Sequence, residues 1–178
     1  TDEKEMLKIP DIHNPRYSYG GGKIISELYG TYFAKKYFKK FIIFRPHNVY
    51  GKDMGNDHVI PEFIERFKKI KNNKRFKIYG NGNEIRSFIH IKDFVSGFDK
   101  IFRRGKTLEI YNIGTSEKIR ISSLAKIMEK IFKKKIKLKK TKILTGSPSI
   151  RCPNITKIKK LGFKQKIRLK DGIKIILK

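Results

Sequence analysis

Two side chains near the start of the chain are spaced for acid–base chemistry. Tyr19 and Lys23 stand four residues apart, about one helical turn, so both can lie on one face of a helix. A free phenol titrates near pH ~10, and a nearby ammonium stabilises its phenolate form. Such a pair can accept a proton from a substrate hydroxyl, and the intervening glycines would let a cofactor approach closely. A tyrosine at a helix start followed by a surface lysine would give the same spacing in so lysine-rich a chain.

The segments that would position this pair indicate an α/β chain. Apolar residues recur at helical spacing from Lys23 to about Phe38, which predicts an amphipathic helix. The apolar run Phe41–Phe44 is typical of a strand buried on both faces of a parallel sheet. Residues 46–58 then form a long loop directly after this strand, where ligands bind in open α/β sheets. The apolar positions of the helix are Ile24, Ile25, Leu28, Tyr32, Phe33 and Tyr37.

Further elements follow to the end of the chain. A strand is expected at 76–79, a buried or alternating stretch at 87–91, and a strand at 109–113. Residues 133–153 are basic and interrupted by proline, and they predict no definite element. Helices are expected at 59–70, 92–102, 154–161 and 169–177, with another that Ser122 or Ser123 can cap and that runs to about Phe132.

The chain is strongly basic. Its net charge is +28, from 44 Lys+Arg against 16 Asp+Glu, a balance that suggests nucleic acid or an anionic surface. Lysine outnumbers arginine, isoleucine is the dominant apolar residue, and the lysines spread along the whole chain. We therefore favour a solvated, compositionally biased surface and regard nucleic acid as the weaker hypothesis. A basic nucleic-acid-binding module remains the alternative from another functional class.

Cysteine usage and the N-terminus predict a cytoplasmic protein. Cys152 is the single cysteine, so an internal disulfide is excluded, and no apolar run approaches the ~18 residues of a membrane span. The N-terminal segment Thr1–Glu5 is acidic and polar, unlike a signal peptide, and it has no initiator methionine. We expect a fragment that begins in mid-domain. His13 and His58 show no metal-ligand spacing with Cys152, so no metal site is predicted.

Five motifs occur in a fixed order. The first is Tyr-Gly-x-x-Lys-x-x-x-Glu from Tyr19, and Arg-Pro-His-Asn-Val-Tyr-Gly follows from Arg45. The third is Ile-Tyr-Gly-Asn-Gly from Ile78, followed by Arg-Ser-Phe-Ile-His-Ile-Lys-Asp from Arg86. The fourth is Tyr-Asn-Ile-Gly from Tyr111, and the fifth is the segment Asn154–Phe163. Together they resemble the extended short-chain dehydrogenase/reductase family of nucleotide-sugar epimerases and dehydratases. One such motif is weak evidence, whereas five in the right order over nearly the whole chain are strong evidence.

The resemblance implies chemistry on a nicotinamide cofactor. Tyr19 would take the proton of a sugar hydroxyl as hydride passes to NAD, and Lys23 would hold the nicotinamide ribose. Pro46 and the backbone of His47 would lie near the nicotinamide. The expected activity is that of an epimerase or dehydratase, with the loop after the strand favouring an epimerase. A sugar-nucleotide 4,6-dehydratase or a UDP-glucuronate decarboxylase stays open.

The resemblance also implies a site for a nucleotide-diphosphate sugar. Asn48 would hydrogen-bond the sugar or the diphosphate, and Arg86 would clamp a phosphate. His58 and Val59 begin a helix and would offer backbone N–H groups to the diphosphate. Tyr79 would pack against the base.

The implied architecture is α/β: the C-terminal part of a Rossmann-like parallel sheet plus a small α/β substrate-binding domain. Residues 1–58 would complete the NAD-binding domain, whose strands could return near 86–113. Residues 59–178 would form mainly the substrate domain. A homodimer through the helix at 23–38 is also implied. The Gly-rich phosphate-binding turn of the family is missing from this sequence, so we expect the chain alone to be inactive.

Several residues depart from the family pattern. Gly22 stands where serine is usual, Ser87 and Asn154 where aspartate is typical. Where the family often has an arginine for the diphosphate, only lysines such as Lys140 and Lys142 are available. These changes weaken the case for tight substrate binding and leave the fold assignment intact.

Four other features have simple structural interpretations. Arg45 is as suited to a structural ion pair as to a ligand. His90 lies in an apolar run, which favours a satisfied core histidine over a catalyst. Asp93 is predicted to be a helix N-cap rather than a catalytic acid. Thr1–Glu3 begins like the dehydratase motif Thr-Asp-Glu-Val-Tyr-Gly, but Lys4 breaks it and Tyr19 follows too soon, so we expect a loop.

Overall fold

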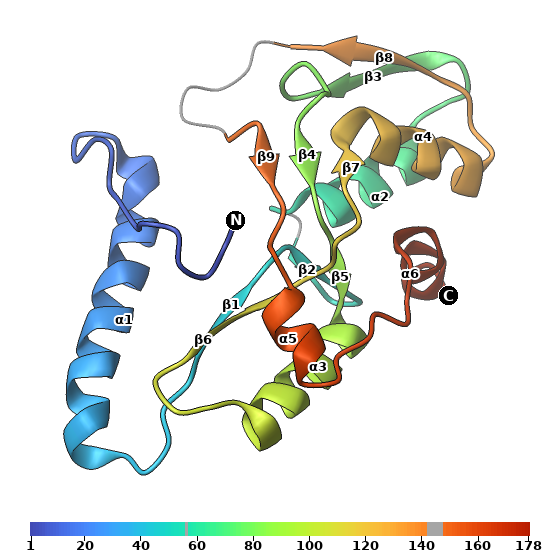
Figure 1. Cartoon of the computed structure of the whole chain (residues 1–178). Coiled ribbons are helices and arrows are strands. Elements are labelled where there is room, and N and C mark those ends of the chain that lie inside the picture. Colours follow the sequence, from blue (N-terminus) through green and yellow to red (C-terminus); the bar gives the residue numbers. More distant parts are fainter. Residues whose placement is uncertain (56, 142–147) are drawn as a thin grey trace.

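The computed structural model describes residues 1–55, 57–141 and 148–178. After an irregular N-terminal segment the chain enters a long helix and then alternates short strands with helices to the C-terminus (Figure 1). Thr1–Glu3 belongs to the irregular segment, which confirms the expected loop. None of the helices in these ranges is long and apolar enough to cross a membrane.

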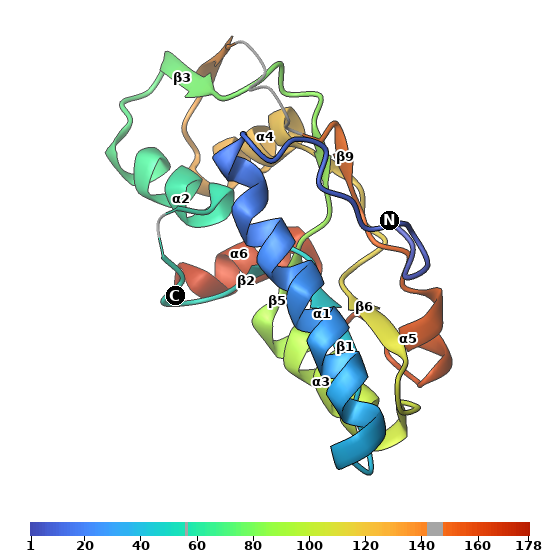
Figure 2. The same cartoon turned by 90° about the vertical axis from the view of Figure 1, so that its left-hand side faces the viewer.

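Helix α1 (Ser18–Tyr37) lies along one side of the molecule, as Figures 1 and 2 show from two directions. It follows a 3-10 turn at Pro15–Tyr17 and starts five residues before the predicted helix. Small residues face the rest of the chain: Gly21 and Ala34 are buried, and Gly30 packs against the Phe41 ring. The predicted amphipathic arrangement is therefore wrong. The exposed apolar residues are Ile25, Leu28, Tyr29, Tyr32, Phe33 and Tyr37.

Parallel strand pairs form the centre of the fold. Strand β1 (Ile43–Pro46) pairs with β6 (Ile110–Ile113), and β2 (Val49–Tyr50) pairs with β5 (Ile89–His90). Phe44 is exposed on β1, so the predicted burial of this strand on both faces is wrong. Because each parallel pair needs a long crossover, helices pack on the strands.

Two helices cover these strands and complete a first hydrophobic core. They are α3 (Ile91–Arg104) and α5 (Thr156–Lys160). Gly97 on α3 allows the close approach, because a Cβ there would lie 3.0 Å from Ile113 Cγ2. The core consists of Ile89, Ile101, Tyr111, Ile113, Ile155, Ile158 and Phe163.

A second, larger core lies toward the other end of the molecule. Strands β3 (Lys74–Ile78) and β8 (Ile136–Lys140) form a parallel pair over α2 (Val59–Lys69) and α4 (Ile121–Phe132). Helix α6 (Leu169–Ile176) adds Leu169 and Ile173 to this core. Tyr50 belongs to the same core, although it precedes residue 59. The division of the chain at residue 58 stays a prediction.

Three short strands connect the two cores. Strand β4 (Ile85–Arg86) lies between β7 (Ile119–Arg120), its antiparallel partner, and β9 (Ile150–Arg151), its parallel partner. Sequence reasoning missed β7 and β9, as well as β2 within the expected loop 46–58 and β8 within 133–153. Strands β2, β7 and β9 have two residues each, too few for a periodicity to be detected, whereas the five residues of β8 lie in a lysine-rich stretch.

Two predicted helix caps are wrong. Helix α4 begins after Arg120 without a side-chain cap, and Ser122 and Ser123 lie within its first turn. The N-cap of α3 is His90, whose Nδ1 accepts from the Lys92 N–H at 3.3 Å. Asp93 instead accepts the backbone N–H groups of residues 166 and 167, far along the chain. His90 is buried and hydrogen-bonded, which confirms it as a core histidine.

Candidate active site

A cavity of about 410 Å³ brings together all five residues that were predicted to bind substrate. They come from the ends of four elements. Asn48 follows β1, His58 and Val59 begin α2, Tyr79 follows β3, and Arg86 ends β4. This placement fits the rule that ligands of α/β folds bind beyond strand ends and at helix starts.

Asn48 sits in a conformation that suits asparagine. Its φ is +43°, in the left-handed region that asparagine tolerates better than most residues. Its side-chain amide N–H donates to the Ser87 carbonyl at 2.7 Å, and its own carbonyl accepts from the Ile89 N–H at 3.2 Å. One of its two side-chain N–H groups is thus used internally, which leaves the other N–H and the side-chain oxygen for a ligand.

Two arginines stand side by side in the cavity wall. Arg86 on β4 is the register partner of Arg151 on β9, and both line the cavity. Arg86 Nη1 donates to the carbonyls of Ile85 at 2.9 Å and Ser149 at 3.4 Å, which orients its guanidinium. Paired guanidinium groups beside a helix N-terminus favour a phosphate or diphosphate.

Sequence reasoning missed Arg151. For the arginine that the family often has at the diphosphate, the sequence offered only lysines such as Lys140 and Lys142. Lys142 falls outside the described residues, and Lys140 is not among the residues that line the cavity. A search for any arginine in 133–153, without a fixed position, would have found Arg151.

Tyr79 and His58 line the cavity in different surroundings. The Tyr79 ring is exposed, and the Lys77 ammonium lies 5.5 Å from its centroid. His58 precedes α2 without capping it through its side chain, and its carbonyl accepts from the Glu62 N–H. Glu62 pairs with Arg66 at 2.8 Å, so this carboxylate is partly neutralised at the helix start.

Tyr19 and Lys23 meet on α1 but lie outside this cavity. The Lys23 ammonium is 5.3 Å from the centroid of the Tyr19 ring, as the spacing predicted. Tyr19 is 76% exposed. A Cβ at Gly20 or Gly22 would meet nothing within 4 Å, so this face of α1 is open to a large ligand.

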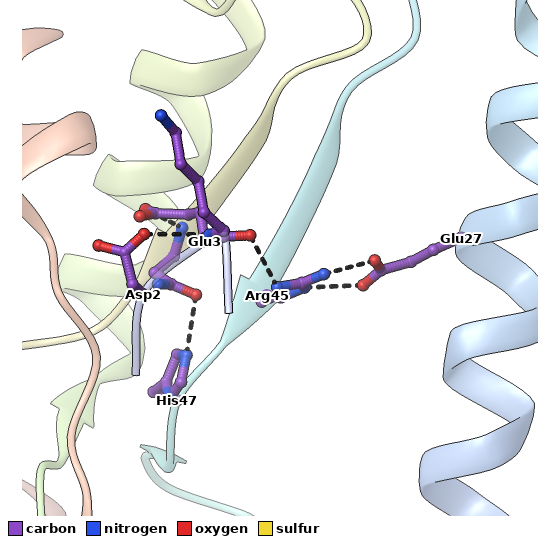
Figure 3. A network of polar contacts seen from close by, with 7 residues as sticks. Asp2, Glu3, Glu27, Arg45 and His47 are labelled. Carbon is purple, nitrogen blue, oxygen red and sulfur yellow. Dashed lines mark hydrogen bonds and ion pairs between the residues drawn. The ribbon is translucent and has the colours of Figure 1, made fainter. Parts of the chain in front are cut away.

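A charged network fixes α1 to the sheet (Figure 3). Arg45 on β1 binds Glu27 on α1 through two hydrogen bonds, Nε to Oε1 at 2.8 Å and Nη2 to Oε2 at 2.6 Å. Its Nη1 also donates to the Glu3 carbonyl at 3.4 Å. The structural ion-pair interpretation of Arg45 is therefore the one that the geometry supports. Glu27 lies one turn beyond Lys23, so the pair anchors the helix close to the predicted catalytic residues.

Pro46 and His47 lie at the carboxyl end of β1, next to this network. His47 Nε2 lies 3.1 Å from Asn112 Oδ1, and the Asn112 amide donates to the carbonyls of Thr1 and Asn154. Since the Asn112 NH₂ group donates to these carbonyls, the atom that faces His47 is the amide oxygen, which can only accept. His47 must therefore carry its proton on Nε2. Burial lowers the pKa of His47, and the hydrogen bond to Asn112 opposes the shift. The imidazole is therefore neutral at pH 7.

Comparison with known proteins places the chain in a family. The model of the "NAD dependent epimerase/dehydratase family" matches residues 1–114. The dTDP-D-glucose 4,6-dehydratase of Dictyostelium discoideum is 36% identical over 130 residues, covering 71% of this chain and 27% of that protein. The human dTDP-D-glucose 4,6-dehydratase is 32% identical over 119 residues, covering 67% of this chain and 33% of that protein. The chain thus spans about a third or less of these relatives.

Solved structures share the fold. A UDP-glucose 4-epimerase of Thermotoga maritima superposes with a TM-score of 0.80 at 24% identity, over 97% of this chain and 58% of that one. A dTDP-glucose 4,6-dehydratase of Streptomyces venezuelae gives 0.83 at 21% identity, over 99% and 53%. These likenesses confirm the predicted α/β architecture. The family match over residues 1–114 and the relative at 36% identity lead to one assignment: the chain belongs to the NAD-dependent epimerase/dehydratase family.

Proposed function

We propose that the protein acts on a nucleotide-diphosphate sugar by transient oxidation of a sugar hydroxyl, as an NAD-dependent epimerase or dehydratase. One observation carries this proposal: Asn48, His58, Val59, Tyr79 and Arg86, chosen from sequence, line a single cavity. Arg151 adds a second guanidinium beside Arg86 in the same wall.

The cavity lining suggests how the substrate would bind. Arg86 and Arg151 would hold the diphosphate, and the first N–H groups of α2 would contribute at Val59. Tyr79, at the end of β3, would pack on the base. The Asn48 oxygen would accept a hydrogen bond from a sugar hydroxyl.

The residues that would hold NAD are Tyr19, Lys23, Pro46 and His47. They fit such a ligand because Gly20 and Gly22 leave the face of α1 open beside the Tyr19 ring. When bound, the nicotinamide would accept a hydride from the sugar carbon. Tyr19 would remove the hydroxyl proton, and Lys23, 5.3 Å from its ring, would stabilise the phenolate.

This first oxidation is common to epimerases, dehydratases and decarboxylases of the family. The relatives above are named as 4,6-dehydratases, whereas the loop after β1 favours an epimerase. We propose that the 178-residue chain alone binds nucleotide but does not turn over a UDP- or dTDP-sugar with added NAD. Tyr19 is mostly exposed and lies outside the cavity, which supports that view.

Titration calorimetry of the chain with UDP tests the binding proposal. We expect saturable binding at one site, weakened about 10- to 100-fold by Arg86→Gln through loss of a charged hydrogen bond. Arg75→Gln is the matched control, because Arg75 is exposed on β3 and is not a cavity-lining residue. Equal weakening by both substitutions would mean that binding follows net charge rather than the cavity.

We also propose a homodimer through α1. Its aromatic residues form an exposed ladder: Tyr29 and Phe33, then Phe33 and Tyr37, have ring centroids 6.1 Å apart. A helix with large apolar side chains on its outer side requires a cover. Sedimentation analysis should show a dimer that Leu28→Glu converts to a monomer, whereas Lys35→Glu should leave it dimeric. A monomeric unsubstituted chain would contradict the proposal.

A further inference from the structure

A buried carboxylate belongs to the wall of the same cavity. Glu84 lies between the turn at Gly80–Gly82 and strand β4, and only 7% of it is exposed. It lines the cavity with Tyr79 and Arg86 but matched no motif in the sequence. An acidic group is unexpected in a pocket that would hold a diphosphate.

One carboxylate oxygen of Glu84 is used and the other is not. Oε1 accepts the Asn81 N–H at 3.1 Å. Gly80 permits this arrangement, because its φ is +88° and a Cβ there would lie 2.0 Å from Oε1. Among the described residues, Oε2 has no hydrogen-bond partner although it is buried.

An unpaired buried carboxylate oxygen is energetically unfavourable unless a donor reaches it. A phosphate has no such donor at neutral pH and would be repelled. The two arginines that suit the diphosphate lie on β4 and β9, whereas the Glu84 carboxylate contacts the turn directly after Tyr79. Since Tyr79 is proposed to pack on the base, a donor near this turn would belong to the nucleoside half of a nucleotide.

We propose that Glu84 Oε2 accepts a hydrogen bond from an O–H or N–H donor on the nucleoside half of the bound nucleotide. The inference rests on the proposed function, because it assumes that the cavity binds a nucleotide-diphosphate sugar. Glu84 then makes the pocket selective for a nucleotide over a free diphosphate. A ribose hydroxyl or a base N–H can donate to Oε2, whereas a free diphosphate has no donor for this oxygen.

Glu84→Gln tests this with almost no change of shape. The amide oxygen can still accept from Asn81, which turns the NH₂ group to the position of Oε2 and replaces an acceptor by a donor. Calorimetry should show UDP binding weakened about 10- to 100-fold. Pyrophosphate binding should stay the same or tighten, because one negative charge is lost.

Glu62→Gln is the matched control. Glu62 lines the same cavity and the substitution removes the same charge, but its carboxylate is already paired with Arg66. UDP and pyrophosphate affinities should therefore move together in this variant. Opposite shifts in Glu84→Gln and parallel shifts in Glu62→Gln are the expected pattern.

Ligand variants identify the donor and do not depend on the folding of a substituted chain. UDP, 2′-deoxy-UDP, 3′-deoxy-UDP and N3-methyl-UDP are titrated into the unsubstituted protein, and one modification should weaken binding as much as Glu84→Gln does. Equal affinity for all four, or parallel shifts of UDP and pyrophosphate in Glu84→Gln, would overturn the role of Glu84 alone. Failure of the unsubstituted protein to bind UDP would instead overturn the proposed function and this assignment with it.

Discussion

Replacing Arg45 by methionine should release α1 from the sheet. The guanidinium makes two short hydrogen bonds to Glu27, at 2.8 and 2.6 Å, and a longer one to the Glu3 carbonyl at 3.4 Å. The two side chains are only 18% and 21% exposed. Arg45→Met keeps the aliphatic volume and leaves Glu27 without its partner.

The size of the effect follows from this burial. Removing one partner of a fully buried pair costs about 3–5 kcal/mol, and exposed pairs are worth up to about 1 kcal/mol. Since water still reaches about a fifth of each side chain, we expect a loss of about 2–3 kcal/mol. The loss should be local, because the buried residues of α1 are two small ones, Gly21 and Ala34, and neither belongs to the two hydrophobic cores.

Hydrogen–deuterium exchange measures this loss directly. A loss of about 2–3 kcal/mol in the free energy of local opening speeds amide exchange in α1 by about 30- to 150-fold. Amides of α2 and α4 should exchange as before. Arg103→Met is the control, because the Arg103–Asp99 pair is 71% and 43% exposed and should contribute less than about 0.5 kcal/mol.

Two results would refute the reasoning. Unchanged exchange in α1 would mean that packing of Gly21, Gly30 and Ala34 holds the helix without the ion pair. Equally faster exchange in α2 and α4 would mean that Arg45 supports the whole fold. The reversed pair, Glu27→Arg with Arg45→Glu, should restore part of the protection if charge pairing is the cause.

Three further predictions follow from burial. Burial lowers the pKa of His47 and His90 below 6.5, so the folded state favours neutral imidazoles, and their contribution to stability is complete above pH 6.5. As the pH falls below 6.5, the free energy of unfolding should drop by up to about 1.4 kcal/mol per pH unit for each histidine, and denaturant titrations of His47→Gln should show a smaller drop. Gly172→Ala should lower the stability by about 1–3 kcal/mol in thermal melts, because a Cβ there would lie 2.1 Å from Tyr50 Oη; an unchanged melting temperature would contradict this packing. Burial also raises the pKa of Cys152, so iodoacetamide should label the folded chain more slowly than the chain in urea, and equal rates would contradict its burial.

Helices could be predicted from the sequence because their evidence is local. The apolar period located α2, α3 and α4 to within a few residues. Caps failed where a distant segment supplied the partner: Asp93 accepts N–H groups of residues 166 and 167 rather than capping α3. The exposed faces of α1 could not be foreseen either, because periodicity shows which residues are apolar and not what covers them.

The candidate site was predictable in part. Its motif residues were chosen in order along the chain, and the fold brings five of them to one cavity. Arg151 was missed because its place depends on a non-local contact, the pairing of β9 with β4. Glu84 was missed because it matched no motif, although the turn that it contacts is only three residues away. Tyr19 and Lys23 were correctly expected to meet, yet their spacing gave no information on their distance from the cavity.

The binding of UDP in this cavity is the central claim, and an NMR titration of the isotope-labelled chain tests it most directly. We predict saturable shift changes at Asn48, Val59, Tyr79, Arg86 and Arg151, with α1 and the exposed lysines of β3 and β8 unchanged. Shifts spread over the lysine-rich surface that vanish on adding salt, or no saturable shifts at these five residues, would contradict the account.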